Sequence, residues 1–293
     1  MTRCEAYWKK VRELLEANDI EGLKKFCEKH KTTLTRIVDH ISYEDRYEVP
    51  MGTMSERALR PLRTLERKDK ELHDCALDIM FDEGVKPTEA IRLAKATQVK
   101  PVVIPDSCVH DSIENILEYL EPNTVDLILT DPPYPAEYLP LWSVLAEKAE
   151  ILLKPGGFLV TYAPQFHLPK IYNMLEEHLS YVWTFCLYQP GPHASVMQRN
   201  IWTNWKPILV FAKEPYNMMW QTDVITSPAR VKTKHEWQQN IEPIKTLIKN
   251  FTVENELVVD PFLGSGTTMK ACEELNRVFF GMDTDEGVFR DAH

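Results

Sequence analysis

Residues 127–134 read LILTDPPY, an apolar run that stops at an acid, two prolines and an aromatic residue. The apolar run predicts a buried strand, and the prolines end it because proline cannot donate a hydrogen bond to a ladder. The chain has to turn at this point, which leaves Asp131 and Tyr134 at the carboxyl edge of the sheet. Open α/β folds bind their ligands at that edge. We therefore expect a substrate site around Asp131 and Tyr134.

A second strand end lies at residues 257–268, LVVDPFLGSGTT, where an apolar run enters a glycine-rich turn. A helix is predicted to follow over residues 269–275. Glycine tolerates positive φ and lets the backbone approach a ligand closely. The turn has neither the third glycine of G-x-G-x-x-G nor the Gly-Lys-Ser/Thr of a P-loop, so a dinucleotide or a triphosphate is not expected.

The next predicted strand, residues 278–282, is followed by Asp283. An acid at this point of a strand-helix-strand unit is placed to accept hydrogen bonds from ribose hydroxyls. A cofactor that contains a nucleoside but needs no phosphate cradle fits S-adenosylmethionine.

From residue 101 onward, short apolar runs alternate with amphipathic stretches. Such alternation predicts an α/β fold whose mostly parallel sheet is covered by helices on both faces. Before residue 101 the apolar residues recur at a spacing of three to four, which predicts helices. We therefore predict a helical domain over residues 1–100 and an α/β domain over residues 101–293. The predicted strands are 102–104, 125–130, 157–163, 181–188, 207–212, 257–260 and 278–282.

Composition excludes several classes of protein. With 44% hydrophobic and 27% charged residues, the chain is typical of folded globular proteins. No apolar run approaches the ~18 residues that span a bilayer. The six cysteines are scattered without a C-x-x-C pair, so neither a zinc site nor a disulfide framework is expected. We expect a soluble protein of a reducing compartment, without a metal and without membrane contact.

The net charge of −10 is distributed unevenly along the chain. Residues 1–104 carry 20 Lys and Arg against 19 Asp and Glu, which gives +1, and residues 105–293 carry 14 against 25, which gives −11. Within the first part, residues 57–70 (RALRPLRTLERKDK) have six basic and two acidic side chains, a local charge of +4. Acidity therefore belongs to the α/β domain, and the basic stretch belongs to the helical one.

The basic stretch precedes a turn signal at residues 82–84 and a helical pattern at residues 89–96. Two helices joined by a short turn with glycine are typical of a helix-turn-helix, although any αα-hairpin has the same pattern. We predict that Arg60, Arg63 and Arg67 contact DNA. The alternative is that they form a solvated helix face.

The two strand ends, DPPY at residues 131–134 and DPFLGSGTT at residues 260–268, resemble in this order the beta class of DNA amino-methyltransferases, which modify adenine N6 or cytosine N4. The resemblance covers about residues 101–293. It implies a Rossmann-like, doubly wound methyltransferase sheet, S-adenosylmethionine as cofactor and DNA as partner, and it suggests a homodimer. It also implies a cytoplasmic enzyme of a bacterial or phage-infected cell, of the restriction-modification type. Further likeness is found in residues 125–127, 153–157, 205–210 and 235–239.

The chemistry of amine methylation explains the first motif. An exocyclic amine has its lone pair delocalised into the ring, so acceptors for its hydrogens help it to attack a sulfonium methyl. We expect the Asp131 carboxylate and the carbonyl of Pro132 to be those acceptors, within a turn that Pro133 completes. Tyr134 is expected to stack on a base that has flipped out of the duplex, because the target atom cannot be reached inside the stack.

Cofactor binding is assigned to the glycine turn and to residues 235–239, which resemble the family's stretch that helps to hold the methionine part. Asp260 either orients the cofactor's amino group or fixes its own loop, and Phe262 is either a packing residue or a cofactor contact. The position of Asp283 often holds glutamate in the family. The predicted cofactor residues are Asp260, Phe262, Gly264, Ser265, Gly266, Thr267, Asp283, His235, Trp237 and Gln238.

Target recognition in the beta class usually lies between the two motifs, which here corresponds to residues 189–234. Arg199, Asn200 and Trp202 in this stretch can read base edges or stack on bases. The stretch is short for a recognition domain, so we expect the helical domain to add DNA contacts. Its residues 60–95 vaguely resemble helix-turn-helix portions of ParB-like proteins.

Adenine N6 is the predicted methyl acceptor. Cytosine N4 is the alternative, although enzymes with that activity more often have Ser in place of Asp131. Methylation of a protein or RNA is less expected, because such relatives usually have Asn-Pro-Pro-Tyr. A non-catalytic DNA-binding regulator is opposed by the intact Asp131, Pro132, Tyr134, Gly264 and Gly266.

Overall fold

The computed structural model describes residues 3–17, 19–30, 34–47, 49, 54–98, 107–190, 194–218, 221–227 and 241–287. The chain divides into two compact units, Met1–Gln98 and Val99–His293, and the sequence predicts a boundary near residue 100. Within the described ranges, no helix has both the length and the apolar character needed to cross a membrane.

The described elements of the first unit are all helices, as the spacing of its apolar residues predicts. Trp8 and Val11 of the first helix are buried in a small cluster with Leu23 of the second. A second, larger cluster is formed by the later helices, with Leu62 and Ala76 at its centre. The helices are α1 (Arg3–Glu16), α2 (Ile20–His30), α3 (Leu34–Arg46), α4 (Glu56–Lys68), α5 (Lys70–Glu83) and α6 (Pro87–Gln98).

Helices α5 and α6 form the predicted pair with a glycine turn. Asp69 caps α5, since its carboxylate accepts a hydrogen bond of 3.0 Å from the Leu72 N–H. Gly84 ends the helix with φ 65, a left-handed conformation that favours glycine. The predicted helix at residues 89–96 is the middle of α6. The predicted helix, glycine turn and helix are thus present, as in any αα-hairpin, and a helix-turn-helix that binds DNA stays a prediction.

The second unit contains an eight-stranded sheet in the order β1-β10-β9-β2-β3-β7-β4-β8. Neighbouring strands are parallel from β1 through β3, while β7 runs antiparallel to β3 and to β4, and β8 is parallel to β4. The sheet is therefore mostly parallel, as predicted. Its strands are β1 (Cys108–His110), β2 (Val125–Thr130), β3 (Leu153–Tyr162), β4 (Ser180–Tyr188), β7 (Trp205–Ala212), β8 (Val224–Thr226), β9 (Leu257–Asp260) and β10 (Val278–Asp283).

Two of these strands, β1 and β8, are missing from the sequence prediction. Each has only three residues, too few for an apolar alternation to be recognised. The predicted strand at residues 102–104 lies outside the described residues.

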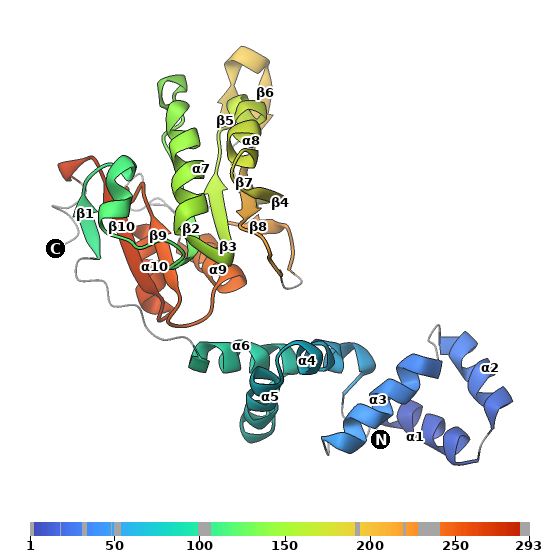
Figure 1. Cartoon of the computed structure of the whole chain (residues 1–293). Coiled ribbons are helices and arrows are strands. Elements are labelled where there is room, and N and C mark those ends of the chain that lie inside the picture. The colour runs from blue at the N-terminus through green and yellow to red at the C-terminus, as the bar shows by residue number, and fades with distance from the viewer. Residues whose placement is uncertain are drawn as a thin grey trace. The chain divides into compact units, whose positions relative to one another are not determined.

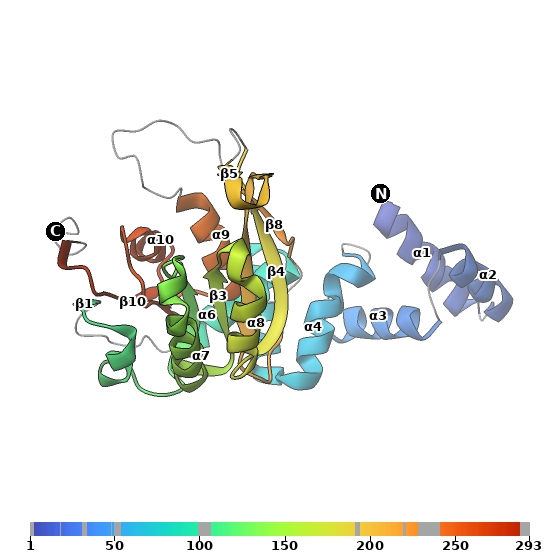
Figure 2. The same cartoon turned by 90° about the horizontal axis from the view of Figure 1, so that it is seen from above.

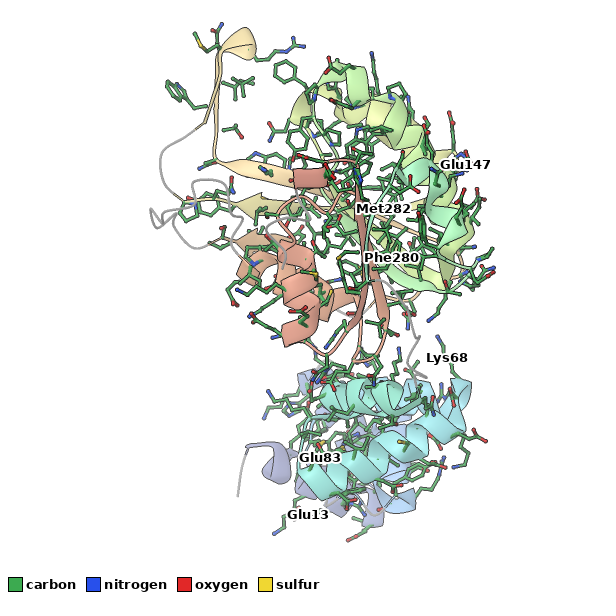
Figure 3. The ribbon with its side chains drawn as sticks, turned by 90° about the vertical axis from the view of Figure 1, so that its left-hand side faces the viewer. Glu13, Lys68, Glu83, Glu147, Phe280 and Met282 are labelled. Carbon is green, nitrogen blue, oxygen red and sulfur yellow. The ribbon has the colours of Figure 1, made fainter. Side chains whose placement is uncertain are left out.

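Helices cover both faces of the sheet, as the top view in Figure 2 shows. Helices α7 (Pro140–Leu152) and α8 (Leu168–Glu176) pack on one face, and α9 (Ile241–Phe251) and α10 (Thr267–Glu274) pack on the other. Side chains of a strand alternate between the two: Ile128 joins the cluster of α7 and α8, and Leu127 and Leu129 join that of α9 and α10. Phe280 and Met282 of β10 also point into the interior (Figure 3). Burial on both faces explains why the central strands β2 and β9 are almost entirely apolar.

The chain leaves the centre of the sheet in opposite directions. From β9 it continues through α10 to β10 on one side, and from β2 it continues through α7 to β3 on the other side (Figure 1). The neighbouring strands β9 and β2 therefore flank a topological switch point, where open α/β sheets leave a crevice outside their carboxyl ends.

Candidate active site at the carboxyl edge of the sheet

The two motifs lie side by side at this switch point. Leu127 pairs with Val258 and Ile128 with Val259 in a parallel register, so the turn after β2 emerges next to the turn after β9. A hydrogen bond of 2.7 Å from Thr130 Oγ1 to Asp260 Oδ1 joins the two strand ends. The expectation that turns 129 residues apart share one edge is confirmed by this register.

Asp260 is buried between the two turns and is held entirely by groups of the chain. Besides Thr130, the hydroxyl of Thr268 donates to its Oδ2 at 2.7 Å and the Phe262 N–H donates to its Oδ1 at 3.2 Å. Burial raises the pKa of Asp260 to about 7, against the lowering effect of these hydrogen bonds, and the charge of Asp131 raises it further. These contacts show that Asp260 fixes the position of its own loop. A contact between Asp260 and the cofactor stays a prediction.

The sequence prediction missed two of the groups that hold Asp260. Thr130 and Thr268 are both buried and both donate to the carboxylate. The sequence did contain a sign of this role, since each motif has a threonine at its boundary. Threonine is, however, equally common in strands and helices where it has no functional role. Only the pairing of the strands shows that the two hydroxyls meet at one acid.

The glycine turn after β9 is an open backbone cradle. Gly264 (φ 50) and Gly266 (φ 71) both adopt the left-handed conformation that other residues adopt at a cost. The Gly264 N–H donates to Asp283 Oδ2 at 2.9 Å, which fixes the turn against the end of β10. Ser265 and Thr267 lie in the same turn, with their hydroxyl oxygens 3.0 Å apart. The four predicted residues of the turn and Asp283 are therefore brought together.

Asp283 has a structural task as well as its predicted one. Its Oδ1 accepts a hydrogen bond of 2.9 Å from the Asp285 N–H, in addition to the bond from Gly264 to Oδ2. The side chain is half-exposed at the edge, so each oxygen keeps acceptor capacity for a ribose hydroxyl. Phe262, by contrast, packs in part against the cluster under α7.

Asp131, Tyr134 and Tyr162 form a group next to Asp260. Burial raises the pKa of Tyr134, and the negative charge of the nearby Asp131 raises it further. Burial likewise raises the pKa of Tyr162 on β3, and Asp131 and Asp260 add to this effect. Both phenols therefore stay protonated at neutral pH. Tyr162 was not predicted as a site residue, because a tyrosine within an apolar run is typical of a buried residue of the hydrophobic core.

Lys206 at the start of β7 approaches the aromatic ring of Tyr134. Its ammonium nitrogen lies 5.5 Å from the ring centroid, which is within range of a cation–π interaction. Since Lys206 belongs to β7, this contact ties the first motif to a strand within the predicted recognition segment, residues 189–234.

The described part of the predicted recognition segment, residues 189–234, contains a hairpin in addition to the sheet strands β7 and β8. Strands β5 (Ala194–Val196) and β6 (Ile201–Thr203) pair around the short helix η4 (Met197–Arg199). The Arg199 guanidinium lies 5.4 Å from the ring centroid of Phe166, Asn200 forms the turn with φ 56, and Trp202 is 72% exposed. The three predicted DNA-contacting residues of this segment are thus on one solvent-exposed hairpin.

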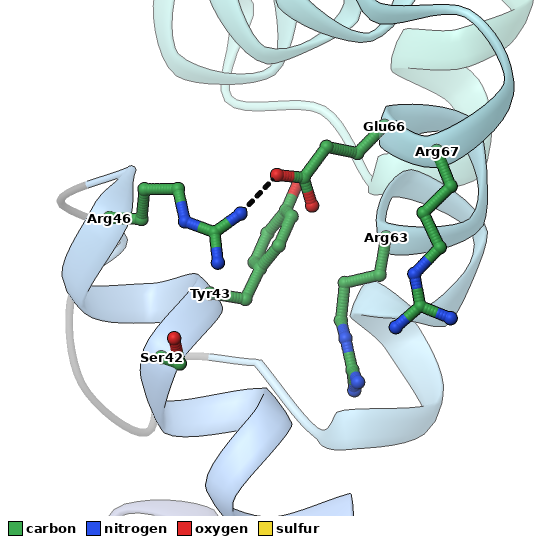
Figure 4. Close-up of a pocket in the computed structure, with 6 residues that line it drawn as sticks. All are labelled: Ser42, Tyr43, Arg46, Arg63, Glu66 and Arg67. Atoms are coloured by element: carbon green, nitrogen blue, oxygen red, sulfur yellow. Dashed lines mark hydrogen bonds and ion pairs between the residues drawn. The ribbon is translucent and has the colours of Figure 1, made fainter.

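Arg60, Arg63 and Arg67 share one face of α4 in the first unit. Arg63 and Arg67 line a pocket with Ser42, Tyr43, Arg46 and Glu66, in which Arg46 is ion-paired with Glu66 (Figure 4). Arg60 and Arg67 are exposed, and Arg63 is half-buried. Three guanidinium groups against one carboxylate leave this pocket positively charged, which is compatible with a phosphate contact.

Three predicted cofactor residues, His235, Trp237 and Gln238, lie outside the described residues.

One acid at the carboxyl edge of the sheet was not predicted. This acid, Asp111, follows β1, and His110 of that strand pairs with Asp283. Its carboxylate accepts hydrogen bonds from the Ser112 N–H, Asn115 and Tyr119. In the part of the chain that the structure describes, no group of three or more His, Cys, Asp or Glu is arranged to hold a metal ion.

Comparison with known proteins agrees with this geometry. The family model N6_N4_Mtase, described as DNA methylase, matches residues 199–293. The chain is 26% identical to the type II methyltransferase M.HpaI of Haemophilus parainfluenzae over 214 residues, which are 58% of this chain and 67% of that protein.

Solved structures show the same fold. The complex of M1.HpyAVI with SAM superposes with a TM-score of 0.52 at 25% identity, covering 64% of this chain and 97% of that one. The PvuII DNA methyltransferase (cytosine-N4-specific) superposes with a TM-score of 0.56 at 17% identity, covering 67% of this chain and 88% of that one. The family model, the type II methyltransferase relatives and the shared fold support a DNA amino-methyltransferase of the N6/N4 type with S-adenosylmethionine as cofactor, in agreement with the resemblance carried by the two motifs.

Proposed function

We propose that the protein transfers a methyl group from S-adenosylmethionine to the exocyclic N6 of an adenine that has flipped out of DNA. The observation that carries the proposal is the meeting of Asp131 and the glycine turn on adjoining parallel strands at the switch point. This arrangement provides one crevice with a place for a nucleoside cofactor on the β9 side and a place for a base on the β2 side.

The cofactor residues fit S-adenosylmethionine by their shape and donor set. Gly264 and Gly266 both have positive φ, and because they carry no side chain, a ligand can approach the backbone of the turn at these two positions. Asp283 stands at the end of the next strand as an acceptor for ribose hydroxyls. When bound, the cofactor supplies an electrophilic sulfonium methyl. We assign His235, Trp237 and Gln238 to its methionine part on the family resemblance alone.

On the β2 side, the residues of the first motif orient the amine. The Asp131 carboxylate and the Pro132 carbonyl accept the two amino hydrogens, which directs the nitrogen lone pair toward the methyl group. Tyr134 stacks on the flipped base, and the Lys206 ammonium near its ring fixes the ring and adds positive charge. Transfer is then governed by positioning and electrostatics within a preformed site.

Asp260 acts on the reaction as a positioning residue. It is bonded to both turns and touches no open part of the crevice, since it is 4% exposed. Its hydrogen bonds fix the distance between the base side and the cofactor side.

The preference for adenine rests on Asp131. In related enzymes, activity on cytosine N4 more often goes with Ser at this place. The fold does not separate the two bases, because the PvuII enzyme, whose name states cytosine N4, has the same fold at 17% identity. Methylation of cytosine N4 is therefore the second candidate.

We assign target recognition to residues 189–234 and further DNA contacts to α4 of the helical unit. A homodimer and a role in a restriction-modification system follow from the resemblance.

The test is direct identification of the methylated nucleoside. Unmethylated plasmid DNA is incubated with the protein and isotope-labelled S-adenosylmethionine, digested to nucleosides and analysed by mass spectrometry. We expect labelled N6-methyladenine with the wild type and none with Asp131→Ala. Labelled N4-methylcytosine would establish the second candidate, and label in protein or RNA but not in DNA would refute both.

A further inference from the structure

The hairpin β5–β6 stands at the same edge of the sheet as Asp131. Strand β7 is antiparallel to β3 and to β4, so β4 ends and β7 begins at the edge where the parallel strands end. The hairpin connects these two points and extends beyond the edge, at the top of Figure 1. Lys206, two residues into the pairing of β7 with β4, already contacts the ring of Tyr134.

Large apolar side chains of this hairpin are exposed to solvent. Met197 at its tip is 81% exposed, Trp202 is 72% exposed and Ile201 is 53% exposed. Isolated exposed apolar residues are common, but three on one short ribbon indicate a surface that is covered by a partner.

The ribbon is held in place at its base and near its tip. The Gln189 N–H donates to the Asn204 carbonyl oxygen at 2.8 Å, and Gln165 Nε2 donates to the Trp205 carbonyl oxygen at 3.2 Å. Near the tip, Arg199 packs over Phe166. The exposed apolar side chains are therefore presented by an anchored support.

The distribution of charged residues along the chain near the hairpin favours a negatively charged partner. Residues 105–293 carry a net charge of −11, yet no acidic residue occurs between Glu177 and Glu214, a stretch that contains Arg199, Lys206 and Lys213. A stretch of chain without acidic residues in an otherwise acidic unit suits a polyanion. A two-stranded ribbon also has the width that the major groove of DNA admits.

From these observations we infer that the hairpin enters the DNA at the target site and that Met197 inserts into the base stack, where it fills the space left by the flipped base. An apolar side chain in that space replaces part of the stacking that the neighbouring bases lose, as apolar wedges of other DNA-binding proteins do. This inference rests on the proposed function, and it adds a residue that holds the base in its flipped state.

The experiment compares methyl transfer to two duplexes under single-turnover conditions. Both carry the target sequence, mapped beforehand on plasmid DNA methylated by the wild type. One duplex is fully paired, and the other has an abasic site opposite the target base, so that extrusion costs less. We expect Met197→Ala to slow transfer to the paired duplex by about tenfold or more and transfer to the abasic duplex by less than about threefold.

Two further variants show whether apolar bulk at the tip is the cause. Met197→Leu keeps that bulk and should transfer methyl groups at the wild-type rate on both duplexes. Ile20→Ala removes an apolar side chain that is 55% exposed on α2, outside residues 189–234 and outside α4, and should also leave both rates unchanged.

The outcomes separate the inference from the proposed function. If Met197→Ala matches the wild type on the paired duplex, or is slowed equally on both duplexes, Met197 does not fill the stack and the inference is wrong while the proposed function stands. If the wild type methylates no DNA, the proposed function is wrong and the inference falls with it.

Discussion

Replacing the buried Asp260 by asparagine should make the protein less sensitive to pH. Asp260 has two threonine donors and one backbone donor, and burial raises its pKa to about 7 from 3.8. The folded state therefore binds a proton at Asp260 more tightly than the unfolded state does. The contribution of this group to stability is fully present below pH 3.8 and is lost as the pH rises through 7. An asparagine side chain at this position would have the same shape and no such titration.

The magnitude follows from the two pKa values. The rise of the pKa from 3.8 to about 7 corresponds to a destabilisation of the folded protein by about 4 kcal/mol at a pH where the acid is ionised in both the folded and the unfolded state. Integration of the linkage relation from pH 5 to pH 8 shows that the free energy of unfolding of the wild type falls by about 2.5 kcal/mol, compared with a protein that has a neutral side chain at this position. We therefore expect the free energy of unfolding of Asp260→Asn, minus that of the wild type, to increase by about that amount over this range.

The assay is urea denaturation of both proteins at several pH values, followed by tryptophan fluorescence and circular dichroism. Asp111→Asn is a control of opposite sign, because hydrogen bonds from Asn115, Ser112 and Tyr119 lower the pKa of Asp111. That variant should lose stability relative to the wild type as the pH rises from acid to neutral. A difference between Asp260→Asn and the wild type that is independent of pH, or that shrinks toward pH 8, would refute the assignment of a raised pKa to Asp260.

Four further variants test the site and the helical unit. Asp131→Ala should reduce the rate of methyl transfer by about a hundredfold or more while S-adenosylmethionine still binds, measured by calorimetry; loss of both would mean that Asp131 is structural. Gly266→Ala, at φ 71, should cost about 1–2 kcal/mol of stability and weaken cofactor binding, whereas Gly84→Ala, at φ 65 in the helical unit, should change stability alone. Reversing the charge of Arg60, Arg63 and Arg67 together should weaken DNA binding and flatten its dependence on salt, by about 0.9 in slope for each phosphate that is no longer neutralised; an unchanged slope would mean that these arginines do not touch DNA.

Much of the site was readable from the sequence because its signals are local. The two consecutive prolines that follow Asp131 end the first strand, and the glycines at 264 and 266 require a turn with positive φ, so both strand ends could be placed without any knowledge of the fold. The apolar runs at residues 125–130 and 257–260 coincide with β2 and β9 as observed. The glycine turn and Asp283 pointed to a nucleoside cofactor, and the family resemblance of the two motifs implied an amine substrate, before any contact between them was known.

What the sequence could not supply is which groups meet across the sheet. The order β9-β2 and its register bring Thr130, Thr268 and Asp260 together and place Lys206 over Tyr134. Strand order is decided by how the whole chain buries its two apolar faces, and no stretch of a few residues encodes it. The raised pKa of Asp260 and the position of the hairpin beside the crevice have the same origin, because both depend on burial and on neighbours that are distant in the chain.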